Sequence, residues 1–464
     1  MLNRVSKQYF QHVEQFSTKR DKAMSKLAIL GGDKVATSSI AENIKWPIVN
    51  RAMEEGVISV LRDGNMSGTD ITKKFEIEFA KWNGTKYALA HSSGTASLQS
   101  AFFGVGLGHG DEIICPSITY WASVLPAMSL GATIVYADID PKTLCLDPAD
   151  FEKRITPRTK AVVVVHYCAY PAPMDEIMAI ARKHNIKVIE DVSHAQGALY
   201  KGKMVGTFGD VAAMSLMSGK SFAIGEGGIL VTDNEEIYQR AMLWGHYERA
   251  ADITLPGLAE YKGLPCGGYK YRMHQLSSVV GLEQLKKYDS ECAVIDKAMK
   301  YFWEGLADLP LDPHMPADAK STKGGWYACK GIYNPDAFDG LSLKYFIEAI
   351  AAEGGQFFGA GCNAALHTHG LFHTMDVYGE GKPSNTANLP ADANKAINQD
   401  GDFPIAENIC NYAFSIPWFK HFDRALIDEQ IAAVRKVCEN YKDLLASDPK
   451  EKVSGKFFQT ARKN

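Results

Sequence analysis

The chain has 464 residues, 46% of them hydrophobic and 22% charged, and a formal net charge of −4. This composition is typical of a globular chain of two or three domains, and it excludes the strongly basic balance expected of a nucleic-acid-binding protein. No segment approaches the ~18 consecutive apolar residues that span a bilayer, and the polar N-terminus lacks the apolar stretch of a secretion signal. We therefore predict a cytoplasmic protein with no nucleic-acid or membrane partner.

Short β-branched runs alternate with stretches of helical periodicity between about residues 50 and 290. Such alternation predicts an α/β domain with a mainly parallel sheet. Runs without polar alternation, such as AVVVV and KVIED, are expected for strands covered on both faces. The predicted strands are 112–115, 133–137, 161–165, 187–189, 211–216 and 229–231, and the predicted helices are 95–105, 121–130 and 174–184.

The character of the sequence changes after about residue 290. We predict an N-terminal extension over 1–50, a large domain over 51–290 and a smaller C-terminal domain over 291–464, which ends in an amphipathic helix at 423–445. Residues 375–402 are rich in turn formers and predict a long loop of the functional or mobile kind. The nine cysteines form no C-x-x-C pair, so neither a disulfide framework nor a metal site is predicted.

One lysine, Lys220, follows the predicted strand 211–216 in the stretch MSLMSGKSFAIGEGG. A P-loop would need glycine at Met214, and an S-x-x-K nucleophile would need serine at Met217. An exposed surface lysine is the ordinary alternative. However, the small neighbours of Lys220 and the glycines of GEGG leave room for a flat ligand, and a desolvated lysine becomes a nucleophile for a Schiff base. The stretch therefore favours a covalent anchor for pyridoxal 5'-phosphate (PLP).

A PLP site needs a carboxylate for the pyridine nitrogen, N–H groups and hydroxyls for the phosphate, and a flat side chain against the ring. Asp191 ends a predicted strand and supplies the carboxylate, although it also suits a helix N-cap. Gly94, Thr95 and Ala96 open a predicted helix, where they supply N–H groups and a hydroxyl or belong to a plain Ser/Thr cap. The aromatic pair that follows the strand 112–115 provides a stacking surface, or packs in the core.

The motifs occur in a specific order along the chain: SSGTA, PSITYW, EDVSHAQGA, SLMSGK with GEGG, and GYKYRM. In that order they resemble those of the DegT/StrS-type sugar aminotransferases, which are PLP enzymes, and the resemblance covers most of the chain. It implies the aspartate aminotransferase fold (PLP fold type I), which has a three-layer α/β/α large domain with a mainly parallel sheet and a smaller C-terminal α+β domain. It also implies a homodimer with shared active sites.

The resemblance assigns a role to each matching position. It makes Lys220 the lysine that forms the Schiff base and carries the proton in the 1,3-transfer. It makes Asp191 the partner of the pyridinium nitrogen, and it places His194 against the hydroxyl of the cofactor ring. The remaining cofactor contacts that it implies are Gly94, Thr95, Ala96 and Ser215 at the phosphate and Tyr120 as the stacking aromatic.

Two positions depart from the family pattern. Met217 stands where the family has a His before the lysine, so any role of that His is lost or moved. Lys270 stands where the family has an Asn that reaches the neighbouring subunit's phosphate, and a lysine can still donate there as a point charge. The intact Lys220 argues against the sugar dehydrases of the same fold, in which a His replaces the lysine.

The resemblance implies transfer of an amino group from an amino acid, usually L-glutamate, or L-glutamine in the cyclitol branch, to a keto- or aldehydo-sugar. A nucleotide-linked sugar, an inosose and a keto-octulosonate are all open as acceptors, in polysaccharide, lipopolysaccharide or amino-sugar biosynthesis. His367 lies where the family has a His near the sugar, or else packs within a loop. A catalytically idle or regulatory family member is the remaining alternative, against which Lys220 and Asp191 argue.

Overall fold

The computed structural model describes residues 26–390, 393 and 397–457. The predicted N-terminal extension lies outside the described residues up to residue 25, as do residues 391–392 and 394–396 of the predicted long loop. Two sheets organise the described part of the chain, a large one and a small one. The site residues predicted from the sequence gather around the large sheet.

The large sheet has seven strands, and the predicted α/β class is confirmed. β9 runs antiparallel to both of its neighbours, and the other neighbouring pairs are parallel. The central strands are buried along most of their length, as expected when helices cover both faces. The strands stand in the spatial order β1 (Tyr87–His91), β9 (Gly228–Thr232), β8 (Val211–Ser215), β5 (Lys187–Asp191), β4 (Thr159–Val165), β2 (Glu112–Pro116) and β3 (Thr133–Ala137).

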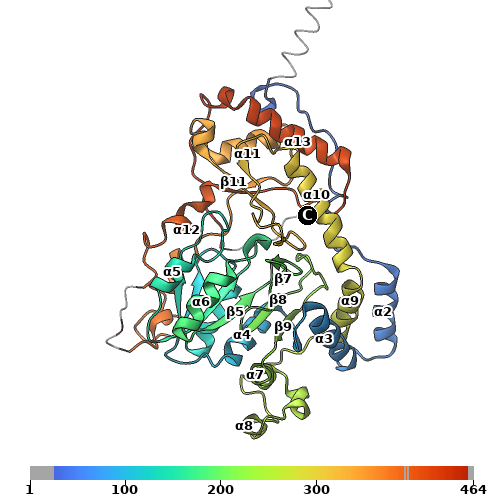
Figure 1. Cartoon of the computed structure of the whole chain (residues 1–464), viewed down its shortest axis with the longest axis vertical. Coiled ribbons are helices and arrows are strands. Elements are labelled where there is room, and N and C mark those ends of the chain that lie inside the picture. Colours follow the sequence, from blue (N-terminus) through green and yellow to red (C-terminus); the bar gives the residue numbers. More distant parts are fainter. Residues whose placement is uncertain (1–25, 391–392, 394–396, 458–464) are drawn as a thin grey trace, which may run out of the picture.

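Helices surround this sheet in Figure 1. Among the described residues, no helix is both long and apolar enough to cross a membrane. A small hairpin, β6 (Leu199–Tyr200) with β7 (Lys203–Met204), lies apart from the large sheet. The helices are α2 (Arg51–Arg62), α3 (Asp70–Asn83), α4 (Gly94–Gly104), α5 (Pro148–Lys153), α6 (Met174–His184), α7 (Glu235–Gly245), α8 (Pro256–Ala259) and α9 (Gln275–Leu285).

Most of the predicted elements of this region are confirmed. All six predicted strands match observed strands, and the helices predicted at 95–105 and 174–184 are α4 and α6. The helix predicted over 121–130 is wrong, because Trp121–Ser123 and Leu125–Leu130 form two separate 3₁₀ turns. Pro126 lies inside this stretch and lacks the N–H that a continuous helix would use. The prediction also missed β1, which pairs with β9.

The small sheet and its helices lie at the other end of the molecule, where Figure 1 shows α11 and α13. Its core also includes Leu27 and Ile40, which precede the large sheet in sequence. The described part of the predicted N-terminal extension therefore packs on the C-terminal region. The elements are α10 (Tyr288–Glu304), β10 (Leu311–Asp312), β11 (Lys330–Tyr333), α11 (Leu343–Ala352), β12 (Gly359–Ala360), β13 (Ala413–Ser415) and α13 (Arg424–Glu439), and the strands stand in the order β10-β11-β13-β12. The short helix α12 (Pro404–Asn408) instead packs on the core of the large sheet through Ala406.

The predicted long loop 375–402 covers the outer edge of the large sheet. Asn385 accepts a hydrogen bond from the Ile134 N–H of edge strand β3 at 2.9 Å and donates to the Ile134 carbonyl at 3.1 Å. Asn398 accepts from the Tyr136 N–H at 2.7 Å. An edge strand presents unpaired backbone groups, and these asparagines pair two of its N–H groups.

Candidate active site

The carboxyl ends of neighbouring parallel strands bring the predicted site residues to one edge of the large sheet. β5 ends at Asp191, and its parallel neighbour β8 ends at Ser215. The N–H of Ser215 donates to the Ser193 hydroxyl at 2.9 Å, which ties the two strand ends together. Ligands of open α/β sheets bind at this edge, so the sequence-based placement of the site agrees with the topology.

The start of α4 forms a small cradle against the end of β8. A Cβ added to Gly94 would lie 2.6 Å from the Cβ of Ser215, and one added to Gly228 would lie 2.3 Å from the Ser93 carbonyl oxygen. Only glycine fits either position. The helix begins at Gly94, so its first N–H groups point toward this edge and favour an anion.

The helix start also carries a Ser/Thr cap of the ordinary kind. The Ser93 hydroxyl accepts a hydrogen bond from the Ala96 N–H at 3.1 Å. The Ala96 N–H is therefore engaged by the cap in this structure, while Thr95 is half-buried beside it. The Ser/Thr cap of the motif is therefore confirmed, and its role in phosphate binding stays a prediction.

Asp191 is buried and held in a fixed orientation. Its Oδ2 accepts a hydrogen bond from the Ser123 hydroxyl at 2.7 Å, and its Oδ1 accepts from the Ser193 N–H at 3.0 Å. Ser123 in turn bonds the Thr119 hydroxyl at 2.7 Å. No helix follows β5 directly, so Asp191 does not cap one. A carboxylate has about four acceptor positions, so Asp191 retains capacity for a ring N–H.

Lys220 is 9% exposed and lies in the loop between β8 and β9. Its backbone N–H donates to the Met217 carbonyl at 2.9 Å, and its own carbonyl accepts from the Trp46 indole N–H at 3.0 Å. Its Nζ lies 4.2 Å from the ring centroid of Tyr327. The burial overturns the reading of Lys220 as a surface lysine, because a charged lysine is rarely buried without a function or partner.

Met217, the departure from the family pattern, shapes this loop. Its side chain is 37% exposed, and its thioether accepts a hydrogen bond from the Gly219 N–H at 2.9 Å. Met217 therefore contributes to the turn that presents Lys220.

His194 lies beside the lysine as a neutral imidazole. Burial lowers the pKa of His194 well below its ordinary value, and the positive charges of Lys220 and Lys330 lower it further. Its Nδ1 accepts from the Cys168 N–H at 3.3 Å, and its ring lies 4.7 Å from that of Tyr327. A neutral His whose Nδ1 accepts carries its proton on Nε2, which can donate to a ring oxygen.

The two predicted aromatic and basic contacts are exposed in the single chain. Tyr120 is 41% exposed, and its ring lies 4.9 Å from that of Trp121. Its exposure next to the Asp191 partner Ser123, whose N–H donates to the Tyr120 carbonyl at 3.0 Å, suits a stacking surface better than core packing. Lys270 is also exposed, on a segment whose Tyr271 carbonyl accepts from the Ser92 N–H at 2.6 Å.

His367 is fully buried, and both of its ring nitrogens have partners. Its Nδ1 bonds the Ser117 hydroxyl at 2.6 Å, its Nε2 bonds Glu407 Oε1 at 3.1 Å, and its ring packs 4.2 Å from that of Phe403. Burial lowers its pKa, and Glu407 partly offsets this. The geometry favours the loop-packing reading of His367 over direct contact with a sugar.

Three contributors were not predicted from the sequence. Ser123 lies between Asp191 and Thr119, Trp46 bonds the Lys220 carbonyl, and Tyr327 covers the Lys220 ammonium group. Ser123 lies two residues after the PSITYW motif, so the motif could have indicated it. Trp46 and Tyr327 come from segments far from Lys220 in sequence, and no local pattern marks them.

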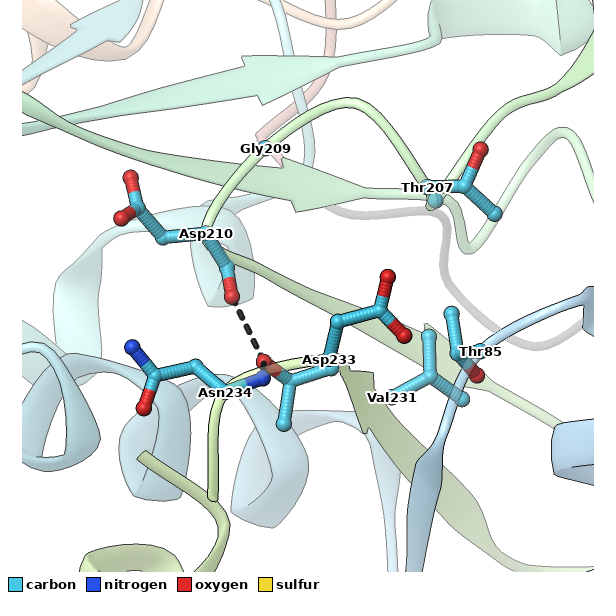
Figure 2. Close-up of a pocket in the computed structure, with 9 residues that line it drawn as sticks. Thr85, Thr207, Gly209, Asp210, Val231, Asp233 and Asn234 are labelled. Carbon is cyan, nitrogen blue, oxygen red and sulfur yellow. Dashed lines mark hydrogen bonds between the residues drawn. The ribbon is translucent and has the colours of Figure 1, made fainter. Parts of the chain in front are cut away.

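A separate pocket of about 300 Å³ lies at the opposite edge of the large sheet (Figure 2). Its lining includes Thr85, Asp210 and Asp233, which lie where β1 and β8 begin and where β9 ends. This pocket is therefore distinct from the edge that carries Lys220.

The residues at the carboxyl edge fit PLP. A cradle of glycines and a helix start suit the phosphate, the buried Asp191 suits the pyridinium nitrogen, and the buried Lys220 amine suits the aldehyde carbon. These are the residue types that a PLP site needs, and the role of each one stays a prediction.

Comparisons with known proteins agree with this chemistry. The model of the DegT/DnrJ/EryC1/StrS aminotransferase family matches residues 48–435. The chain is 32% identical to a putative L-glutamine:3-amino-2,3-dideoxy-scyllo-inosose aminotransferase of Micromonospora echinospora, over 81% of this chain and 90% of the relative. It is 37% identical to the GDP-perosamine synthase of Caulobacter vibrioides, over 78% of this chain and 89% of that relative. The crystal structure of the aminotransferase from Psychrobacter cryohalolentis matches with a TM-score of 0.73 and 26% identity, over 85% of this chain and 98% of the other.

Proposed function

This chain belongs to the DegT/DnrJ/EryC1/StrS aminotransferase family and is a PLP-dependent aminotransferase, and from that premise we propose that it aminates the carbonyl group of a sugar or cyclitol ring. The donor is an amino acid, L-glutamate or L-glutamine. The support for the acceptor class is that the similar relatives are named for an inosose and for a nucleotide-linked amino sugar. Cell-surface polysaccharide, lipopolysaccharide and amino-sugar biosynthesis are the processes that consume such products.

One observation carries the proposal for the site. The buried amine of Lys220, the buried carboxylate of Asp191 and the Gly94 cradle all lie at the carboxyl edge of β5 and β8. PLP supplies an electron sink when it is bound there. The chain's part is to hold it and to move a proton.

We assign the proton transfer to Lys220. With PLP bound, its Nζ would take the proton from the α-carbon of the amino donor, hold it as an ammonium group and release it again beside the cofactor. Asp191 keeps the ring nitrogen protonated, because Ser123 and the Ser193 N–H hold its carboxylate buried and correctly turned. His194, whose Nδ1 accepts a hydrogen bond from the Cys168 N–H, would donate from Nε2 to the oxygen on the PLP ring.

The remaining contacts position the cofactor. Gly94, Thr95, Ala96 and Ser215 lie at the phosphate end, and Tyr120 covers one face of the ring. His367 acts through Ser117 and Glu407, its hydrogen-bond partners, rather than by touching the acceptor.

A second copy of the chain completes the site in our proposal. α2 and α3, on one side of the molecule in Figure 1, expose Ile58 (43%), Leu61 (50%) and Ile77 (66%). Both helices pack against α9, and exposed aliphatic side chains of this kind favour an interaction surface. Lys270 stays exposed in the single chain, which is expected of a residue that serves the partner's phosphate site.

The proposal is tested by the spectrum and by half-reactions of the holoenzyme. We expect a band above 400 nm in the intact protein and its loss in Lys220→Ala, together with a fall of about 10³-fold or more in transamination. Lys442→Ala, at an exposed lysine in the 3₁₀ turn Tyr441–Leu444, is the matched control and keeps both. A persistent band in Lys220→Ala would refute the assignment of the lysine.

The acceptor class is tested separately. The pyridoxamine form is offered an inosose, a nucleotide-linked keto-sugar and a keto-octulosonate, and the return of the band above 400 nm is followed. Return with at least one of them supports the proposal. The PLP form is then offered L-glutamate and L-glutamine separately, and the amino acid that removes the band above 400 nm is the donor. No return with any of the three would contradict the acceptor class.

A further inference from the structure

Tyr327 lies between three parts of the chain that are distant in sequence. Its ring centroid is 4.2 Å from Lys220 Nζ, 4.7 Å from the His194 ring and 5.6 Å from the Trp418 ring, to which it stands edge-on. The residue precedes β11 and so reaches the edge of the large sheet from the C-terminal region. Its ring is a wall of the place where the lysine amine lies.

The backbone around Tyr327 is clamped to the lysine loop. A Cβ added to Gly325 would lie 2.3 Å from the Cβ of Ser221, the residue after Lys220. The Trp418 indole N–H donates to the Gly325 carbonyl at 3.0 Å. The backbone that carries the ring therefore cannot move away from the lysine loop without a shift of both segments.

The two residues that flank Tyr327 have left-handed backbone conformations. Trp326 has φ of 55° and Ala328 has φ of 56°, and neither is glycine. Such conformations are unfavourable for residues with a Cβ and persist only where the surroundings enforce them, often at functional sites. The fold thus maintains a strained segment whose central side chain contacts the lysine.

An aromatic face attracts an ammonium group and does not attract a neutral amine in the same way. We propose that Tyr327 is a positioning residue that stabilises the protonated Nζ of Lys220 while the lysine carries the proton, an inference that rests on the proposed role of Lys220. When Nζ takes the proton from the α-carbon of the donor, it becomes the cation that the ring faces. No atom of Tyr327 enters the reaction.

The ring, not the hydroxyl, makes these contacts. Among the described residues, the Tyr327 hydroxyl has no hydrogen-bond partner, while its ring has three neighbours. Tyr327→Phe therefore keeps the proposed interaction and Tyr327→Leu removes it. The pair separates a ring effect from a hydroxyl effect at the same position.

The first test uses the apoprotein. Lys220 is methylated with formaldehyde and cyanoborohydride at pH 7 and at about pH 11, which is above the ordinary pKa of a lysine side chain. Peptide mass spectrometry measures the rate of methylation at each pH. At pH 7 we expect Tyr327→Leu to react roughly 3- to 30-fold faster than Tyr327→Phe, because the ring no longer favours the unreactive ammonium form. At the higher pH the ratio of the two methylation rates should approach one. A ratio that is the same at both pH values would mean that the exchange only opens access of the reagent to Lys220, and it would overturn the proposal.

The second test uses the holoenzyme and the donor half-reaction. We expect Tyr327→Leu to lower the rate about tenfold at saturating donor, with little change in KM and a larger isotope effect for donor deuterated at the α-carbon. Tyr327→Phe should stay close to the parent protein. Equal loss in both variants, or loss in neither, contradicts the proposal.

Two controls make each outcome decisive. Tyr345→Leu, on α11 and bonded to Ser447, reports any general effect of the exchange, and thermal unfolding checks that each variant is folded. Lys220→Ala separates the two levels of inference. If it abolishes the band above 400 nm while Tyr327→Leu changes nothing, only the role of Tyr327 fails.

Discussion

Two adjacent carboxylates at the end of β5 have different environments because successive strand side chains point to opposite faces. Asp191 is held by Ser123 and Ser193 at the site.

Glu190 is fully buried on the other face, where it accepts hydrogen bonds from the backbone N–H groups of Gly206, Phe208 and Gly209. His166 donates to it at 3.0 Å. Glu190 therefore fastens the strand that presents Asp191.

The pKa of Glu190 follows from this environment. Burial works to raise it, but the hydrogen bonds from His166, Gly209 and Gly206 outweigh burial and lower it below the ordinary value. A carboxyl with a lowered pKa in the folded state stabilises the protein above its unfolded pKa, about 4.3, and loses that contribution as pH falls through the folded value.

We predict that Glu190→Gln lowers the free energy of unfolding at pH 7 by about 3 kcal/mol or more, because the amide places its NH₂ among buried donors. The difference from the parent protein should narrow as pH falls below about 4. Thermal unfolding across this pH range measures both effects. Glu152→Gln, at a partly exposed carboxylate that Lys183 and His184 contact, should change little. Parent-like stability of Glu190→Gln at pH 7 would refute the prediction.

At the scale of elements, the loop 375–402 matters as an edge cover. It was predicted as functional or mobile because of its turn formers, yet Asn385 and Asn398 pair with backbone groups of β3. Both asparagines are buried, although loop residues are usually exposed. Composition did indicate the loop, but the partner strand is about 250 residues away in sequence, so only the fold could reveal its task.

We predict that Asn385→Ala lowers the free energy of unfolding by about 1–3 kcal/mol, because it leaves the buried Ile134 N–H of β3 without its partner. Asn408→Ala removes an exposed asparagine of α12 and should have a much smaller effect. Chemical or thermal unfolding of the two variants gives the comparison. The PLP band above 400 nm should persist in both, since β3 lies at the far edge from β8. Equal stability of the two variants would show that the edge pairing contributes nothing.

At the scale of the whole molecule, Lys220 lies where three regions meet. Trp46 of the N-terminal segment bonds its carbonyl, Tyr327 of the C-terminal region covers its amine, and β8 carries it to the sheet edge. The N-terminal segment is in turn fastened to the C-terminal region, because the Ala36 N–H donates to the Glu353 carbonyl at 2.9 Å.

The proposed shared site makes a prediction about mixed dimers. Lys220→Ala disables the site of its own subunit, whereas Lys270→Ala would disable the partner's site by an estimated 10- to 100-fold through loss of a charge-assisted hydrogen bond. Co-expressed with different tags and purified through both, a hybrid of the two variants has one site in which both lysines are intact. Its transamination rate should reach about half that of the parent dimer.

Two results would contradict this arrangement. If Lys270 serves its own subunit, every site of the hybrid carries one lesion and activity does not return. If the protein elutes as a monomer under active conditions, no hybrid forms at all. A hybrid of two differently tagged Lys220→Ala chains is the control and stays inactive.

Much of the large sheet and of the site could be predicted from the sequence because the signals are local. Unbroken apolar runs predicted the strands, and Gly94, Asp191 and Lys220 lie beside them in short motifs. The prediction failed at 121–130, where apolar periodicity outweighed Pro126, and it missed β1. His367 shows a further limit, since a histidine in a loop has the same letters whether it faces a substrate or, as here, is fully buried between Ser117 and Glu407.

The sequence by itself determined the α/β class, the lysine and carboxylate at strand ends, and the resemblance to the aminotransferase family, which the order of the motifs indicated. The class and the strand ends follow from hydrophobic patterns within a few residues of each group, whereas the family follows from the resemblance of the ordered motifs. Only the tertiary structure decided that Ser123 orients Asp191, that asparagines cover β3, and that a strained segment places the Tyr327 ring on Lys220. These contacts join residues far apart in the chain, so no local pattern in the sequence marks them.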